Sequence, residues 1–174
     1  MAIIDPEIFM PIITWIELHP GWAAIVVLLI SLCESLAVVG LFIPGLIIMG
    51  IIGGLVGAGT LDLTTTLICA TLGAIFGDSI SYSLGHRFKN HLPELWPFKK
   101  FPHWLARGKD FFTRYGEMSI IFGRFVGPVR PFIPVIAGTM AMNPRRFLLA
   151  NIISAIIWAP IYMLPGMGIT WLTF

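Results

Sequence analysis

The chain has 174 residues, of which 57% are hydrophobic and only 11% are charged, and its mean hydropathy is +0.89. An average soluble domain carries about 25% charged residues, so this chain has too few polar side chains to cover a surface in water. The composition therefore excludes a water-soluble globular protein and indicates one that a lipid bilayer covers. Cys33 and Cys69 both lie in apolar runs and are interpreted as packed thiols.

The formal charge changes sign along the chain. Residues 1–85 hold six acids and no Lys or Arg, which gives −6. Residues 86–115 hold seven bases and two acids, and the rest of the chain holds four arginines and one acid, which gives +5 and +3. The positive-inside rule predicts that the basic stretch faces the cytoplasm and that both termini lie outside.

The first predicted element is an amphipathic helix over residues 1–20. Asp5-Pro6-Glu7 is typical of a helix start, because acids and proline both favour the first turn. His19-Pro20-Gly21 is expected to end it. The apolar side of this helix is expected either in the membrane interface or against the rest of the protein.

Residues 22–60 are apolar except for Glu34 and contain a break at Pro44-Gly45. The arm after this break has about 14 residues and reaches only ~21 Å, less than the ~30 Å hydrocarbon core. Broken backbone at membrane depth is tolerated only where protein or water satisfies it. The segment is therefore predicted to be a re-entrant hairpin with Pro44-Gly45 at its tip, and residues 62–86 to be a transmembrane helix.

The second half repeats this order after a basic interfacial segment at 87–115. Residues 116–142 are predicted to form a second re-entrant hairpin around Gly127-Pro128, and residues 144–170 a second transmembrane helix. A weak similarity between GLFIPG at 40–45 and GRFVGP at 123–128 agrees with a repeat. Inverted-topology transporters have such repeats and bind substrate at the midplane between the breaks.

The predicted fold class is thus an all-α integral membrane protein, with one membrane domain over residues 1–174. Two opposed re-entrant helical hairpins form an inverted repeat, each followed by a transmembrane helix, and interfacial amphipathic helices complete the fold. Glycine-rich faces permit a homodimer without requiring one.

Aromatic side chains are mixed with bases in the basic segment, which is typical of a membrane interface. Two interpretations stay open: an anchor on anionic lipid, or a surface that collects lipid headgroups. Nucleic-acid binding is not expected of a stretch held to the bilayer at both ends. His86, His91 and His103 lack a ligand spacing with acids or cysteines, so neither a metal nor a cofactor is predicted.

Four ionisable residues fall within the apolar segments: Glu34, Asp78, Arg124 and Arg130. Each costs at least ~2.5 kcal/mol at the centre of a helix that faces lipid, so each must pair or face water. The two acids belong to the first half and the two arginines to the second. The charges cancel if the tips of the two hairpins meet.

Arg124 and Arg130 flank Gly127-Pro128, and guanidinium groups bind phosphate through two parallel hydrogen bonds. They are the candidates for binding a lipid phosphate. Glu34 and Asp78, when removed from water, are candidates for taking up the coupling proton or ion. The alternative is that these residues form purely structural ion pairs.

That structural alternative is as well supported as a functional one for Asp78. It lies beside Gly73 and Gly77, a pattern that favours close helix contact. Tyr82, one turn further on, is able to hydrogen-bond it. Tyr82 and Asn151 are secondary site candidates.

A series of motifs in fixed order carries a family resemblance. The motifs are ESLAVVGLFIPG at 34–45, GAIFGD at 73–78 with Tyr82 and Gly85, FGRFVGPVR at 122–130, AGTM at 137–140, Phe147, Asn151 and Trp158. This order, over about residues 22–165, resembles the DedA family of bacterial inner-membrane proteins, whose domain is also known as the VTT or SNARE-associated domain.

The resemblance implies a multi-pass protein of the bacterial cytoplasmic membrane with two opposed re-entrant hairpins. It also implies transport of undecaprenyl phosphate or phospholipid across that membrane, with dependence on a proton or sodium gradient. The family's essential acid falls on Glu34 and its two essential arginines on Arg124 and Arg130. Many members carry a second acid directly after Pro-Gly, where this chain has Leu46, and this puts coupling by an acid pair in doubt.

The leading functional prediction is a transporter for a phosphate-bearing lipid, with hinges at Pro44-Gly45 and Gly127-Pro128. The alternative is a non-transporting scaffold or anchor for a lipid-phosphate enzyme. An enzyme is not expected: Arg130-Pro131 fits a membrane phosphatase motif, but Gly123 stands in place of its lysine and no Ser-Gly-His segment occurs.

Overall fold

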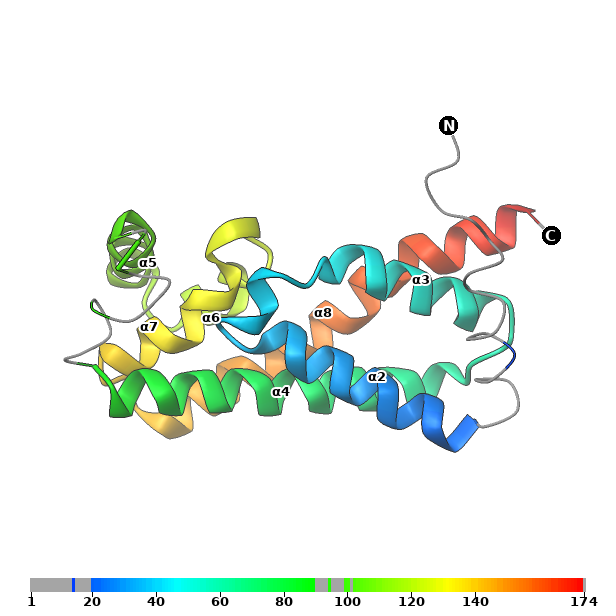
Figure 1. The fold of residues 1–174 in the computed structure, drawn as a ribbon, viewed down its shortest axis with the longest axis horizontal. Helices are drawn as coiled ribbons and strands as arrows, with labels where there is room; N and C mark the ends of the chain where they lie inside the picture. The colour runs from blue at the N-terminus through cyan, green and yellow to red at the C-terminus, as the bar shows by residue number, and fades with distance from the viewer. Residues whose placement is uncertain (1–13, 15–19, 90–93, 95–98, 101, 174) are drawn as a thin grey trace.

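The structure is a computed structural model that describes residues 14, 20–89, 94, 99–100 and 102–173 (Figure 1). The described part is helical and contains no strand, which confirms the predicted all-α class. The helix predicted over residues 1–20 lies almost wholly outside the described residues.

The described elements are α-helices and short 3-10 helices. They are α2 (Pro20–Ser35), η1 (Val39–Leu41), α3 (Gly45–Gly57), α4 (Leu63–Arg87), α5 (Pro102–Tyr115), α6 (Met118–Gly123), η3 (Gly127–Phe132), α7 (Ile133–Thr139) and α8 (Pro144–Thr173).

Two of these helices are long and apolar enough to cross a bilayer. They are α4, over Leu63–Arg87, and α8, over Pro144–Thr170, and they lie over the two segments predicted to be transmembrane helices. At 1.5 Å per residue they extend ~38 Å and ~40 Å, which exceeds the ~30 Å hydrocarbon core.

Asp62 caps the start of α4, where its Oδ2 accepts a hydrogen bond from the Thr65 backbone N–H at 2.7 Å. That bond, with one from the Thr65 side chain, lowers the pKa of Asp62 below its ordinary value.

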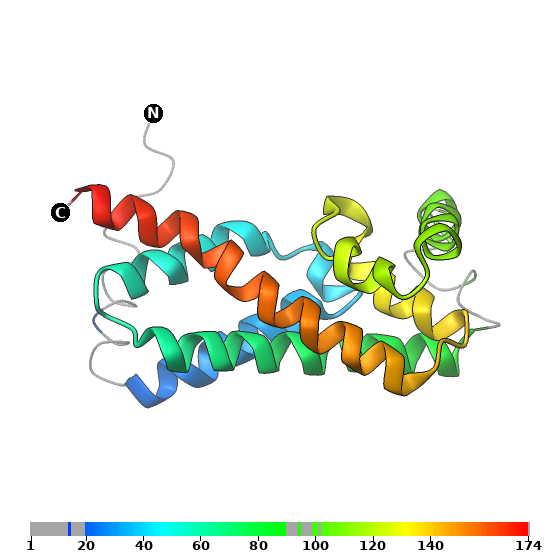
Figure 2. The ribbon, with the colours of Figure 1, turned by 180° about the vertical axis from the view of Figure 1, so that it is seen from behind.

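The shorter helices turn back near the middle of the molecule. α2 packs along α4, η1 turns the chain, and α3 returns along α8 (Figure 1). From the other end, the chain reaches the middle at α6 and η3, and α7 returns along α4 to the end where α8 begins (Figure 2). η1 and η3 contact each other, so the turns of the two halves meet.

The first turn begins earlier than the Pro44-Gly45 break in the sequence indicates. α2 ends at Ser35 and reaches only ~24 Å. The Ala37 backbone N–H, which a continued helix would direct to Cys33, donates instead to the Ser81 hydroxyl of α4 at 3.0 Å. A polar side chain from a neighbouring helix thus satisfies the broken backbone, and residues 36–44 form the turn.

Glycines let the helices approach closely where they cross. A Cβ on Gly77 of α4 would collide with the Leu32 carbonyl of α2, and Ser31 donates to the Ala70 carbonyl at 2.6 Å in the same contact. This agrees with the close helix contact predicted at Gly73 and Gly77. Gly166 of α8 similarly lies directly against the Gly50 carbonyl of α3.

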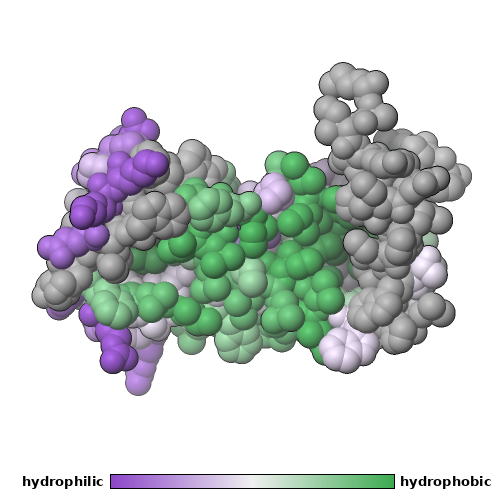
Figure 3. Space-filling model, in the orientation of Figure 1, coloured by the Kyte–Doolittle hydropathy of each residue, from purple (hydrophilic) through white to green (hydrophobic). Residues whose placement is uncertain are grey.

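The surface separates apolar from charged residues. Figure 3 shows hydrophobic residues over the middle of one face and hydrophilic residues at the end that carries α5. Large apolar side chains are exposed, including Phe42 at 68% and Ile169 at 65%, and a surface of this kind indicates contact with lipid. Helix α5 buries Leu105 against Phe132 and exposes Arg107 toward solvent.

Gly166→Ala is expected to lower the melting temperature of the detergent-purified protein. The added methyl group would collide with the backbone of α3, and such overpacking costs about 1–3 kcal/mol. Gly168→Ala is the matched control, because a Cβ there meets nothing within 4 Å and the gain in helix propensity is the same. Equal melting temperatures for the two variants would contradict close α3–α8 packing.

Candidate functional site

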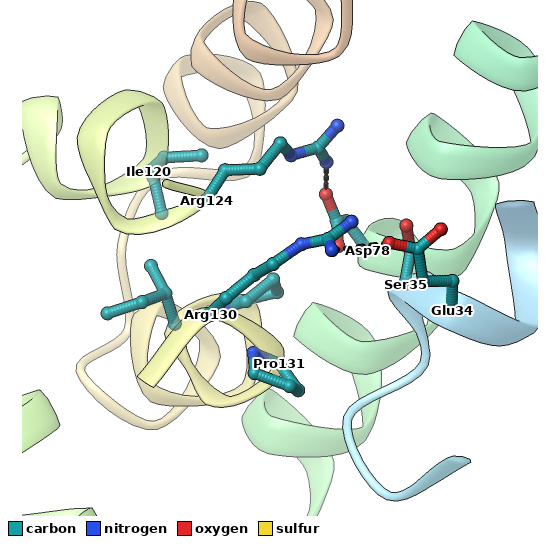
Figure 4. A pocket seen from close by; sticks show the side chains of 9 residues that line it. Glu34, Ser35, Asp78, Ile120, Arg124, Arg130 and Pro131 are labelled. Carbon is teal, nitrogen blue, oxygen red and sulfur yellow. Dashed lines mark hydrogen bonds and ion pairs between the residues drawn. The ribbon is translucent and has the colours of Figure 1, made fainter. Parts of the chain in front are cut away.

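Four ionisable side chains from four different segments line one cavity between the two turns (Figure 4). Glu34 lies in the last turn of α2 and Asp78 in α4, and both belong to the first half. Arg124 directly follows α6 and Arg130 lies in η3, in the second half. The structure therefore brings together the four residues that the sequence places at membrane depth.

The four charges form two ion pairs that connect the halves. Nη2 of Arg124 pairs with Oδ2 of Asp78, and Nη1 of Arg130 pairs with Oε1 of Glu34. The exposed fractions of these side chains are 4% and 9% in the first pair and 15% and 1% in the second. Removing one partner of a buried pair leaves an uncompensated charge and costs about 3–5 kcal/mol, so the pairs oppose separation of the halves.

Asn151 of α8 also contacts the site, whereas Tyr82 does not. Arg124 donates through Nη2 to the Asn151 side-chain oxygen at 3.0 Å, and the Asn151 amide donates to the Ile75 carbonyl at 3.2 Å. The Tyr82 hydroxyl instead donates to the Met142 carbonyl. The hydrogen bond to Asp78 that the sequence allows for Tyr82 is therefore not formed: Tyr82 packs with Phe147 in a separate cluster.

Two aromatic residues of α8 face the guanidinium groups. Cζ of Arg130 lies over the rings of Trp158 and Tyr162, at 4.9 and 5.4 Å from their centroids. Cζ of Arg124 lies 5.5 Å from the centroid of Trp158. All three distances are within the ~6 Å range of cation–π interactions.

Several polar atoms at the site are buried without a hydrogen-bond partner. They are Oε2 of Glu34, Oγ of Ser35, Nη1 of Arg124, Nη2 of Arg130 and Nε1 of Trp158. The cavity has a volume of about 10 Å³, which is room for about one water molecule. A phosphoryl group therefore fits only if the cavity widens. In the described part of the chain, no three His, Cys, Asp or Glu side chains are grouped to hold a metal ion.

The two predicted hairpin tips, Pro44-Gly45 and Gly127-Pro128, are each next to charged residues of the site. A Cβ on Gly45 would overlap the Glu34 carboxylate, so the start of α3 lies directly against the acid, and a larger residue there would displace that carboxylate. Gly127 and Pro128 form the first turn of η3, between the two arginines. Leu46, at the position where the resemblance implies a second acid in many members, is 61% exposed and lies outside the buried cluster.

Ser35 and Tyr162 are site residues that the sequence did not single out, and Trp158 was named only as one of the motif residues that carry the family resemblance. Ser35 is the polar neighbour of Glu34 in an apolar run, which is a visible signal. Trp158 is seven residues after Asn151 and Tyr162 four after Trp158, spacings that place side chains on the same helix face. Applied to Asn151, this periodicity would have found both aromatic residues.

Comparison with known proteins gives a family and several relatives. The model of the VTT domain matches residues 36–168. An uncharacterized membrane protein of Buchnera aphidicola subsp. Baizongia pistaciae is 39% identical over 84% of this chain and 57% of its own length. Inner membrane protein YabI of Escherichia coli K12 is 38% identical over 83% of this chain and 57% of its own length. Protein DedA of the same strain is 31% identical over 83% of this chain and 68% of its own length. No solved structure matches.

The chain spans a little over half the length of the first of these relatives. The family model covers most of the chain, and the relatives align over most of it. The two long apolar helices and the exposed apolar surface agree with relatives that are named inner membrane proteins. The chain therefore belongs to the VTT-domain family, as a DedA-type, multi-pass protein of the bacterial inner membrane.

Proposed function

We propose that this chain is a transporter that moves a phosphate-bearing lipid, undecaprenyl phosphate or a phospholipid, across the inner membrane. The observation that carries the proposal is the cluster of two arginines and two acids, buried between the turns of the two halves. Buried ionisable groups in an apolar protein mark a substrate or ion pathway by default. The fold alone does not carry this assignment.

The choice of a phosphate headgroup follows from the chemistry of the arginines. Guanidinium groups stay charged at any relevant pH and present parallel N–H donors that match phosphate oxygens. Arg124 and Arg130 each keep one buried nitrogen without a partner. A phosphate between them gains donors from both, at the expense of their bonds to Asp78 and Glu34.

The membrane placement in this proposal follows from helix length. α2 and α3 reach ~24 and ~20 Å and are too short to cross singly, so we interpret α2–η1–α3 as one re-entrant hairpin. We interpret α6–η3–α7 as a second re-entrant hairpin that enters the membrane from the opposite side. Helices α4 and α8 are then the two membrane-spanning helices. The ion pairs then lie near the midplane, where inverted-repeat transporters bind substrate.

Coupling in this proposal works by charge exchange. Protonation of Glu34 removes the negative partner of Arg130 and frees that guanidinium for phosphate, and ionisation of Glu34 restores the competition that expels the anion. Asp78 stands in the same relation to Arg124. The headgroup and the acids thus compete for the same two cations.

Neutralising a whole ion pair tests the phosphate site without leaving a buried charge unpaired. Asp78→Asn/Arg124→Gln and Glu34→Gln/Arg130→Gln are each expected to fold and to reduce translocation of phosphate lipid in liposomes by tenfold or more, the effect of about 1.4 kcal/mol or more. The matched control is Glu117→Gln/Arg146→Gln. That pair also joins an acid to an arginine at 2.9 Å, but its side chains are 49% and 69% exposed.

Full translocation by both neutralised pairs would contradict the role of the four charges as the phosphate site. Absence of translocation by the wild-type protein itself would contradict the transporter and favour the scaffold alternative. In that alternative the four charges serve only to hold the halves together. A loss that also occurs in the surface control would indicate a general effect of charge on the reconstituted protein.

Glu34→Gln alone tests the coupling role. Glutamine is a permanently neutral isostere of protonated glutamate, so the variant is expected to bind phosphate lipid and to lose the stimulation of transport by a proton gradient. Transport is measured in liposomes with and without an imposed pH difference, next to wild type and Asp78→Asn. Unchanged stimulation in Glu34→Gln would exclude Glu34 as the coupling acid.

A further inference from the structure

The ring of Trp158 contacts both cations of the site, and neither the ion pairs nor the proposed function accounts for these contacts. It is fully buried in α8, and the guanidinium carbons of Arg124 and Arg130 lie 5.5 and 4.9 Å from its centroid. Two like charges therefore share one aromatic partner. Indole is the strongest of the natural rings in attracting a cation.

Hydrogen bonding does not explain the position of this ring. Its only polar atom, Nε1, is buried without a partner, although a buried tryptophan N–H usually finds one. Trp158 belongs to a core cluster that also contains Ala155 and Ala159 of its own helix and Met49 of α3. Packing and the two cations are therefore the interactions that the described contacts assign to Trp158.

A guanidinium group that stacks on an aromatic ring presents its face to the ring, whereas carboxylates and phosphates bind its N–H edge. The two interactions do not compete, so a guanidinium held over a ring is able to exchange one anion for another without moving. Ion pairing alone gives the arginines no such support, since exchange requires the acids to leave. Tyr162, whose ring centroid is 5.4 Å from that of Trp158, extends the aromatic contact to Arg130.

We propose that Trp158 is a positioning residue of the anion site: its ring holds the guanidiniums of Arg124 and Arg130 by their faces while their N–H edges exchange acid for phosphate. The part about phosphate rests on the proposed function. The part about the arginines stands on the contacts alone. The two parts are tested separately.

The arginine part is tested by a double-mutant cycle on melting temperature in detergent. Wild type, Trp158→Leu, Arg130→Gln and the double variant are compared. If the ring holds the cation, Trp158→Leu lowers the melting temperature less in the Arg130→Gln background than in wild type. Additive shifts would overturn the proposal, whether or not the protein binds any lipid.

The phosphate part is tested with fluorinated tryptophans introduced at position 158 by nonsense suppression. Fluorines withdraw charge from the face of the ring and scarcely change its shape. Affinity for a short-chain phosphatidic acid is expected to fall stepwise with the number of fluorines, to about tenfold below wild type, while the fold stays intact. Trp158→Phe is expected to retain more affinity than Trp158→Leu.

Met163→Leu serves as the packing control, because Met163 is fully buried in α8 within the same cluster, and its affinity is expected to equal that of wild type. Equal affinity across the fluorinated series would overturn the positioning role toward phosphate. If wild type binds neither this probe nor a short-chain polyprenyl phosphate, the proposed function fails, and the cycle still decides whether Trp158 holds the arginines.

Discussion

Two ion pairs buried in an apolar body are the constraint on which this structure depends. Each pair joins an acid of the first half to an arginine of the second. Neither half is able to bury its own charges, because an unpaired ion in a low-dielectric interior is far more costly than a paired one. The halves are therefore complementary in charge as well as in shape, and the site lies where they meet.

The broken helices follow from the same constraint. The short arms end near the middle of the molecule, where Glu34 meets Arg130 and Arg124 meets Asp78 of the long helix α4 (Figure 4). Irregular backbone is tolerated there because neighbouring side chains satisfy it, as Ser81 does for Ala37. Glycines at the crossings bring the arms close enough for these contacts.

The small volume of the cavity links binding of the phosphate to opening of the ion pairs in the proposed mechanism. A space of about 10 Å³ excludes a headgroup as long as both acids hold both arginines, so binding of the anion and release of the acids are the same event. The aromatic residues of α8 add a contact that this exchange leaves in place. In the proposal, α8 is thus more than a membrane span: one of its faces supplies Asn151, Trp158 and Tyr162 to the site.

The sequence by itself determined the class of protein, the two long apolar helices and the four ionisable residues of the site. These features depend on composition, on run length and on the cost of a charge in an apolar run, which are all local properties. The family resemblance also implied roles for Glu34, Arg124 and Arg130 from the sequence motifs alone. Which acid pairs with which arginine was not determined, because nothing local distinguishes Glu34 from Asp78 as a partner.

Only the tertiary structure decided which acid pairs with which arginine, where the first turn begins, and what Tyr82 and Trp158 contact. The first turn begins at residue 36, well before Pro44, because a serine on α4 accepts the freed backbone N–H. The Tyr82 hydroxyl donates to the Met142 carbonyl, which is distant in sequence, and not to Asp78. Trp158 of α8 contacts both arginines, which lie in other segments of the same half. Each of these contacts joins residues far apart in the chain, and sequence periodicity describes one helix face without identifying what packs against it.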